Sequence, residues 1–264
     1  MKVAFIGGGN MAGALIGGML QAGFKPSEID VLEVDVARGA ELTARHSVSA
    51  HPRPGDWLQA SDTIVLAVKP QQIREAAASI KPHLKRPLVL SIAAGIRAHT
   101  ISESLATSKI VRAMPNMPAL IRAGITAATS LPDVSGAERG RADMILSAVG
   151  AVIWLDDESM LDAVTALSGS GPAYVFYFIE AMQKAALEMG FNEAQARALT
   201  LHTFAGSAEL AMQSQESAAA LRQKVTSKGG TTAAALASFD DDKVDEAIAR
   251  AVRAAAARAR ELGS

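Results

Sequence analysis

Short apolar runs alternate with helix-length segments through the first 160 residues, and this alternation restricts the possible folds more than any other feature. The expected strands are apolar runs, at Lys2–Ile6, Ile29–Val34, Thr63–Val68, Leu88–Ala93, Lys109–Ala113, Ile125–Thr129 and Val152–Leu155. Helices are expected between most of them, at Asn10–Gln21, Val36–Arg45, Gln71–Ile80, His99–Leu105 and Ser135–Val149. Continuously apolar strands separated by helices are typical of a parallel sheet that is covered on both faces. The pattern therefore predicts a doubly wound α/β domain over residues 1–160.

Residues 161–264 contain no further run of β character and are expected to be wholly helical. They hold 27 of the chain's 53 alanines, although they make up only two-fifths of its length. Each alanine buries little apolar area, so a bundle of about 100 residues with alanine faces would have a weak core by itself. We expect this second domain to pack against another copy of itself. The alternative is a self-contained bundle that rests on the first domain.

Composition excludes several classes of partner and site. With 26 basic and 27 acidic residues the net charge is −1, so neither nucleic acid nor an anionic membrane surface is an expected partner. There is no cysteine, and the five histidines lack metal-ligand spacing, so no metal site is expected. No apolar run is long enough for a signal peptide or a membrane span, and we expect a cytoplasmic protein.

A glycine-rich segment follows the first expected strand: residues 7–12 read GGGNMA, a G-x-G-x-x-A pattern that opens a helix. Gly7 would allow a tight turn, Gly9 would let the backbone approach a pyrophosphate, and Ala12 would permit close helix packing. The position at the start of a strand–helix–strand unit favours a dinucleotide site over a merely tight turn.

Glu33 lies near the end of the second expected strand, where an acidic residue binds the adenosine ribose hydroxyls of NAD. Arg38 follows closely and could instead attract the 2′-phosphate of NADP. The alternative is that both are ordinary surface charges.

Three further strands end in segments that would meet at the carboxyl edge of the sheet, where ligands of open α/β sheets bind. The segments are Ala67–Pro70, Ser91–Gly95 and Arg112–Pro118. Any one of them could be a plain strand-to-loop junction. Together they predict one wall of a cleft.

Two glycine-rich segments lead into helices in the second domain, at residues 167–174 and 225–233. Glycines followed by hydroxyl residues at a helix start present free backbone N–H groups, which could bind a small carboxylate. A capped helix with a glycine turn is the alternative. No Tyr-x-x-x-Lys pair and no Ser/His/Asp arrangement is present. A dehydrogenase built this way would act on a substrate that needs little help from a strong acid.

Six blocks of this sequence resemble the pyrroline-5-carboxylate reductase family. They occur in family order and together cover nearly the whole chain. The blocks lie at residues 7–11, 66–71, 93–95, 114–116, 165–174 and 225–232, and the last, reading VTSKGGTT, is similar to the family's own signature.

The resemblance implies hydride transfer from NADP(H), with NAD(H) as the other candidate, to the C=N bond of 1-pyrroline-5-carboxylate, which gives L-proline in the last step of proline biosynthesis. It also implies a Rossmann-type doubly wound domain, followed by an all-helical domain (161–264) for substrate binding and dimerisation. A homodimer, or a ring of dimers, would then place the 229–232 loop of one chain beside the nicotinamide held by its partner.

The resemblance further assigns residues to the two ligands. Thr232 is the expected catalytic residue, with its hydroxyl on the ring nitrogen. The substrate-binding residues are Ser227, Gly229, Gly230, Thr231 and Thr232. The cofactor-binding residues are Ile6, Gly7, Gly8, Gly9, Asn10, Met11, Glu33, Val68, Lys69, Pro70, Ala93, Ala94 and Asn116.

The sequence departs from the family pattern at the expected 2′-phosphate site. The stretch Leu32–Arg38 lacks the family's common Asn/Ser-Arg pairing, and Pro54 stands where asparagine is frequent. The family usually prefers NADPH, so these departures keep NADH open. Lys228 replaces a common proline, at a position that varies in the family.

Two other functions compete with the reductase. A β-hydroxyacid dehydrogenase has a similar domain order but needs a lysine and an asparagine where this chain has Val175 and Ile179. A non-catalytic dimer that senses dinucleotides is the other, although both threonines of the 229–232 loop are retained.

Overall fold

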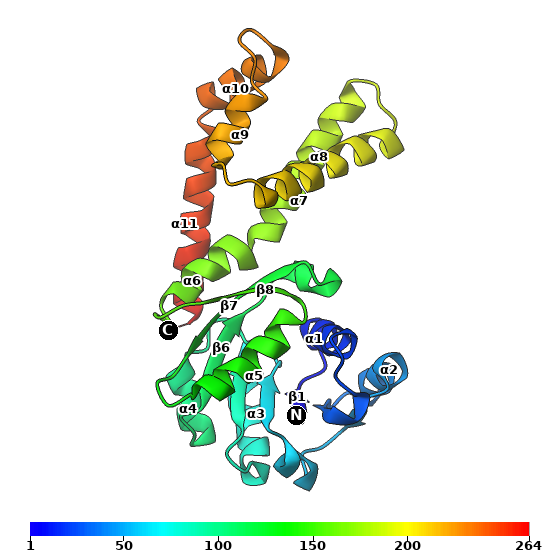
Figure 1. Ribbon diagram of the computed structural model, residues 1–264, viewed down its shortest axis with the longest axis vertical. Helices are drawn as coiled ribbons and strands as arrows, with labels where there is room; N and C mark the ends of the chain where they lie inside the picture. Colours follow the sequence, from blue (N-terminus) through cyan, green and yellow to red (C-terminus); the bar gives the residue numbers. More distant parts are fainter. Residues whose placement is uncertain (264) are drawn as a thin grey trace. The chain divides into compact units, whose positions relative to one another are not determined.

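An eight-stranded sheet forms the centre of the first of two compact units in this computed structural model, which describes residues 1–263 (Figure 1). The strand order is β3-β2-β1-β4-β5-β6-β7-β8. The strands are β1 (Val3–Ile6), β2 (Ile29–Leu32), β3 (Ser49–His51), β4 (Thr63–Leu66), β5 (Leu88–Ser91), β6 (Ile110–Met114), β7 (Gly124–Ser130) and β8 (Gly150–Trp154). This unit comprises Met1–Ser170 together with the chain from Ala255 onward.

Helices cover both faces of the sheet because the central strands are apolar on both sides. Val3 and Phe5 of β1 belong to one buried cluster, and their neighbours Ala4 and Ile6 belong to another. The first cluster includes side chains of α1 (Asn10–Gln21), α2 (Val36–His46) and α5 (Gly136–Ser147). The second includes α3 (Ile73–Ile80) and α4 (Ala98–Leu105). The prediction of a doubly wound α/β domain is confirmed.

The sheet differs from the expected one in two respects. β7 runs antiparallel to β6, with Ala113 opposite Ala128. Residues 115–123 between them contain only a short 3-10 helix, whereas a parallel return needs a crossover of a dozen or more residues. The added strand is β3, whose Ser-Ala-His sequence lacks an apolar run and gave no signal.

Short helical turns connect these elements. The 3-10 turns are η1 (Pro26–Glu28), η2 (Asp56–Ala60), η3 (Pro70–Gln72), η4 (Lys81–His83) and η5 (Met117–Ile121). After β8 the chain forms α6 (Met160–Val164) and a single π-helical turn, η6 (Thr165–Gly169).

The second unit, Gly171–Ala254, is all-helical, as expected. Its helices are α7 (Gly171–Glu188), α8 (Glu193–Gln213), α9 (Ala218–Lys224), α10 (Thr231–Asp241) and the first part of α11 (Val244–Leu262). Asn192 and Gln195 form a capping box at the start of α8. Gly190, which ends the turn after α7, has a φ of 94°, a value that favours glycine.

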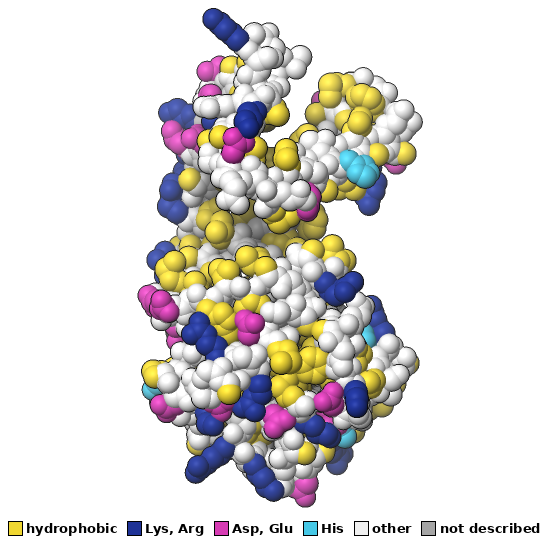
Figure 2. All heavy atoms as spheres, in the orientation of Figure 1, with side chains coloured by type: hydrophobic (Ala, Val, Ile, Leu, Met, Phe, Trp, Pro, Cys, Tyr) yellow, Lys and Arg dark blue, Asp and Glu magenta, His cyan; other side chains and the backbone are white. Residues whose placement is uncertain are grey.

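This helical unit has almost no core of its own. Only Ala186, Ala196 and Thr200 are buried within residues 171–254. Large apolar side chains are exposed instead, among them Tyr177, which is 71% exposed, and Phe176, and Figure 2 shows many yellow side chains over these helices. Exposed apolar surfaces of this kind mark interaction sites. The composition argument that alanine-faced helices make a weak core holds.

Residues 1–263 lack two kinds of feature, a membrane-spanning helix and a metal-ligand cluster. No helix in that range is both long and apolar enough to cross a membrane. The same residues contain no cluster of three or more His, Cys, Asp or Glu side chains able to hold a metal ion.

Candidate functional site

The loops after β1 and β4 touch at the point where the strand order reverses. From β1 the chain proceeds to β2 and β3 on one side and then returns to β4 on the other. Gly7 follows β1 with a φ of +97°, and a Cβ added there would lie 2.9 Å from Val68 Cγ1 and 3.0 Å from the Ala67 carbonyl oxygen. Only glycine fits this crossing. Ligands of open α/β sheets bind at such a switch point.

The first turn of α1 presents backbone N–H groups without a side-chain cap. Gly9 is the N-cap residue, and it has no side chain to accept these hydrogen bonds. A Cβ at Gly9 would meet nothing closer than 4.0 Å, so the space in front of the helix is open. Free N–H groups and the positive end of the helix dipole together suit a pyrophosphate.

Glu33 is tied to the glycine loop by two hydrogen bonds. Its Oε2 accepts one from the Gly8 amide at 2.8 Å, and its Oε1 accepts one from the Asp35 amide at 3.0 Å. Asp35 in turn caps α2, accepting from the amides of Ala37 and Arg38. Both oxygens of Glu33 therefore already hold the backbone around the cavity.

Arg38 also holds the glycine loop, through two hydrogen bonds. Its Nε donates to the Gly8 carbonyl oxygen at 2.9 Å, and one terminal nitrogen donates to Asn10 Oδ1 at 3.0 Å. A guanidinium has five N–H groups, so three remain for a ligand. Sequence reasoning treated Arg38 as a candidate for phosphate binding but did not identify it as a support for the glycine loop.

A cavity of about 490 Å³ lies over the carboxyl ends of β1, β2 and β4. Of the predicted cofactor residues, it brings together Ile6, Gly7, Gly8, Gly9, Glu33, Val68 and Lys69. Asn10 lines the adjacent groove of about 540 Å³, which shares Gly8, Gly9 and Arg38 with the cavity. Met11, Pro70, Ala93, Ala94 and Asn116 line neither space.

Arg53 also lines the cavity, and sequence reasoning missed it. It lies between Pro52 and Pro54 in the loop after β3, and its guanidinium has no partner among the described residues. The Arg53 carbonyl oxygen accepts a hydrogen bond from Trp57 Nε1 at 3.4 Å, and Trp57 stacks on His51 with 4.0 Å between ring centroids. Because β3 gave no sequence signal, nothing placed this loop beside β2.

Asn116 is buried and already has a structural partner. Its Oδ1 accepts a hydrogen bond from the Ile125 amide at 2.9 Å, which fixes the start of β7. Ala93 follows β5, and its amide donates to Ser91 Oγ at 3.3 Å.

The 229–232 loop in the helical unit is a glycine turn that leads into an uncapped helix start. Gly229 has a φ of +71°, and Gly230 is the N-cap of α10 with no side-chain cap. The Gly230 amide donates to the Ser227 carbonyl at 3.0 Å, and a Cβ at Gly230 would lie 2.5 Å from Ser227 Oγ. Thr231 and Thr232 begin the helix, so their amides are available to a carboxylate.

Two family profiles match this chain. A profile described as pyrroline-5-carboxylate reductase dimerisation matches residues 158–262, and one described as NADP oxidoreductase coenzyme F420-dependent matches residues 2–95. A 3-hydroxyisobutyrate dehydrogenase structure from Salmonella typhimurium has a TM-score of 0.52 at 17% identity, which shows a shared fold alone.

Curated relatives and solved structures agree over the full chain. The pyrroline-5-carboxylate reductase of Pseudomonas aeruginosa is 39% identical over 99% of this chain and 96% of its own, and that of Haemophilus influenzae is 38% identical over 98% and 97%. A Coxiella burnetii pyrroline-5-carboxylate reductase structure has a TM-score of 0.94 at 36% identity, covering 100% of this chain and 98% of its own. The Plasmodium falciparum pyrroline carboxylate reductase with NADP bound has a TM-score of 0.89 at 28% identity, with the same coverage. The chain belongs to the pyrroline-5-carboxylate reductase family.

Proposed function

We propose that this chain reduces the C=N bond of 1-pyrroline-5-carboxylate with NADPH to give L-proline, the last step of proline biosynthesis, in the cytoplasm. The observation that carries the proposal is that curated relatives bearing this name match over 99% of the chain, a range that includes both the glycine loop and the 229–232 loop. We assign dinucleotide binding to residues 1–160, and substrate binding and dimerisation to residues 161–264.

The cofactor-binding residues are proposed as Ile6, Gly7, Gly8, Gly9, Asn10, Met11, Glu33, Val68, Lys69, Pro70, Ala93, Ala94 and Asn116. The open first turn of α1 would hold the pyrophosphate, and the cavity over β1, β2 and β4 would take the adenosine end. When bound, the nicotinamide supplies the hydride. The contribution of this chain is to hold its ring in one position.

The substrate carboxylate is assigned to the amides of Gly230, Thr231 and Thr232 at the start of α10, with Ser227 and Gly229 shaping the loop. The Thr232 hydroxyl is assigned to the ring nitrogen. A cyclic imine is readily protonated and then becomes electrophilic, so the reaction needs no strong acid from the protein. Correct positioning of the two reacting carbons can contribute roughly 7–11 kcal/mol.

Arg38 and Arg53 are proposed to recognise the 2′-phosphate that distinguishes NADPH from NADH. Both line the cavity beside the end of β2, where the family's Asn/Ser-Arg pairing is absent. Arg53 has no partner among residues 1–263, and Arg38 keeps three donor groups beyond its bonds to the glycine loop. Glu33 and Asp35 oppose the phosphate, so NADH remains the competing cofactor.

The homodimer is proposed to form through the helical unit. A groove of about 770 Å³, lined almost wholly by apolar side chains of α7, α10 and α11, includes Tyr177, Phe178 and Ile248. A second copy would cover it, and the 229–232 loop would complete the partner's site. A ring of such dimers is the larger assembly proposed.

The test is to supply purified protein with pyrroline-5-carboxylate and either NADPH or NADH, and to follow both loss of reduced nicotinamide and appearance of proline. Turnover with kcat/KM higher for NADPH is expected. Dinucleotide binding without turnover of this substrate would instead support the non-catalytic sensor. The dehydrogenase alternative requires turnover of a β-hydroxyacid.

A further inference from the structure

The loop from β5 to α4, residues 92–97, is held by side chains from a distant part of the sequence. It carries Ala93 and Ala94, which the proposed function assigns to the cofactor, and Gly95, whose φ is +79°. Neither alanine has a side chain that could fix the loop. Backbone amides hold its start, where Ile92 donates to the Leu66 carbonyl oxygen and Ala93 to Ser91 Oγ, so the rest of the loop depends on contacts at its far end.

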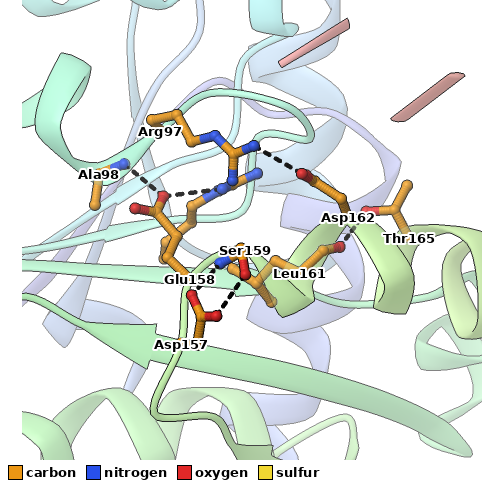
Figure 3. A network of polar contacts seen from close by, with 9 residues as sticks. Arg97, Ala98, Asp157, Glu158, Ser159, Leu161, Asp162 and Thr165 are labelled. Carbon is orange, nitrogen blue, oxygen red and sulfur yellow. Dashed lines mark hydrogen bonds and ion pairs between the residues drawn. The ribbon is translucent and has the colours of Figure 1, made fainter. Parts of the chain in front are cut away.

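Two carboxylates from the segment after β8 provide those contacts (Figure 3). Asp162 Oδ2 accepts a hydrogen bond from an Arg97 terminal nitrogen at 2.7 Å. Glu158 Oε1 accepts one from the Ala98 amide at 2.7 Å, at the first turn of α4. The same oxygen accepts a hydrogen bond from Arg112 at 2.9 Å. We call these four side chains, Arg97, Arg112, Glu158 and Asp162, the loop clamp.

Two side chains of the loop clamp are buried, so their ion pairs must stay formed. The Arg112 side chain is only 3% exposed and that of Asp162 only 6%. A buried charge without a partner is strongly destabilising, so each of these two side chains requires its counter-ion. Asp157 adds to the negative field, because hydrogen bonds from Ser159 and the charge of Arg97 hold the pKa of its carboxyl below the usual range.

The C-terminal end of α11 contacts the same loop. A Cβ added to Gly95 would lie 3.3 Å from the Leu262 carbonyl oxygen, and one added to Gly263 would lie 2.9 Å from the Gly95 carbonyl oxygen. Backbone therefore packs on backbone here. Together with the loop clamp, this contact holds the loop at Gly95 and at Arg97–Ala98.

We propose that Arg97 is a positioning residue for hydride transfer, acting through the loop clamp to fix Ala93 and Ala94 against the nicotinamide ring. The inference rests on the proposed function. Near-attack geometry is sensitive to displacements of about 1 Å, so a loosened loop slows the chemical step more than it weakens binding of the distant adenosine end. A purely structural ion pair would change stability alone.

The experiment compares Arg97→Met, which keeps the length of the stem and removes the charge, with wild type. We expect kcat to fall about tenfold while KM for NADPH changes less than about twofold, and the isotope effect with 4-deuterated NADPH to increase. Arg97→Lys keeps a cation for Asp162 and should recover most of kcat. The single variant leaves the Asp162 carboxylate buried and unpaired and could fail to fold for that reason. The double variant Arg97→Met/Asp162→Leu has no such carboxylate, and it should show the expected loss of kcat of about tenfold.

The matched control is Lys109→Met. It breaks a comparable ion pair, Lys109 Nζ to Glu138 Oε1 at 2.6 Å, just before the amino end of β6. It should lower the melting temperature and leave kcat unchanged. If Arg97→Met also changes only the melting temperature, or if kcat and NADPH binding fall together, the positioning role is wrong. Wild-type protein that does not turn over pyrroline-5-carboxylate would instead overturn the proposed function itself.

Discussion

The Glu33 carboxylate accepts a hydrogen bond from the Gly8 amide at 2.8 Å, which joins the end of β2 to the glycine loop. In dinucleotide-binding folds of this kind, the acidic residue at this position binds ribose hydroxyls. Here one oxygen holds the loop and the other accepts from Asp35 at 3.0 Å. Glu33 therefore has two effects, mechanical support of the loop and negative charge beside the ribose, and two substitutions can separate them.

Glu33→Gln keeps an oxygen that can accept from Gly8 and removes the charge. We expect the ratio of kcat/KM for NADPH to that for NADH to rise by about fivefold, because repulsion of the 2′-phosphate is relieved. Glu33→Ala should raise the same ratio and also weaken binding of both cofactors, because the loop loses its anchor. The measurement is steady-state kinetics with each cofactor. An unchanged ratio in both variants would mean that the charge does not reach the 2′-phosphate.

Arg53→Ala tests the residue that only the structure revealed. Loss of one charge-assisted bond to a phosphate should raise KM for NADPH by about tenfold and leave KM for NADH unchanged. Lys85→Ala, on an exposed loop that does not line the cavity, is the charge-matched control. Equal effects on the two cofactors would show that Arg53 does not read the 2′-phosphate.

Much of the fold was predictable because its signals are local. Apolar runs and helix-length spacing identified seven of the strands, and the glycine pattern identified the start of α1 at Asn10, where the structure has it. The strand β3 was missed because its pairing with β2, Val31 opposite Ala50, depends on a partner distant in the sequence. The antiparallel direction of β7 likewise follows from the short connection between β6 and β7, and the pattern of apolar residues does not predict strand direction.

The site was predictable to the extent that backbone alone forms it. Gly7, Gly9 and Gly230 were identified because they lie in glycine-rich segments that lead into helices, and at Gly7 the structure admits only glycine. Side chains that act through long-range pairing gave no signal: Arg53 faces the cavity only through β3, and Glu158 bonds to Ala98 across 60 positions. Such pairs depend on tertiary structure, so no local sequence motif predicts them.

Thr232→Ala tests the assignment of the substrate loop. If the hydroxyl bonds to the substrate ring nitrogen, its removal should lower kcat by roughly ten- to a hundredfold, since bonds to charged groups are the stronger ones. The Kd for NADPH, measured by fluorescence titration, should not change. Thr232→Ser keeps the hydroxyl and should retain most of the activity. Parallel loss of turnover and cofactor affinity would place Thr232 elsewhere.

The lowered pKa of the Glu138 carboxyl predicts how the free energy of unfolding changes at acidic pH. Burial raises the pKa of its carboxyl, but hydrogen bonds from Lys109 and Ser135 outweigh this effect and lower the pKa from 4.5 to about 2. The carboxylate therefore stabilises the fold above pH 4.5, and this contribution is lost as the pH falls from there toward 2. It is worth at most about 3 kcal/mol. Urea unfolding of Glu138→Gln should show a shallower loss of stability between about pH 5 and pH 3 than wild type. Identical slopes would contradict this.

Subunit complementation tests whether the 229–232 loop completes the partner's site. A Cβ at Gly9 has open space, and aspartate is a favourable N-cap, so Gly9→Asp should fold while its carboxylate repels the pyrophosphate. Thr232→Ala should disable only the substrate loop. Homodimers of the Gly9→Asp variant should be nearly inactive, and homodimers of Thr232→Ala should keep at most about a tenth of wild-type activity.

A heterodimer of the two variants, co-expressed with different affinity tags and purified through both, distinguishes the arrangements. If the loop acts across the interface, one of the two sites combines an intact glycine loop with an intact Thr232, and the heterodimer should have about half the wild-type activity. If each site is built from a single chain, both sites carry a defect and no activity returns. Recovered activity would also show that a complete active site requires the dimer.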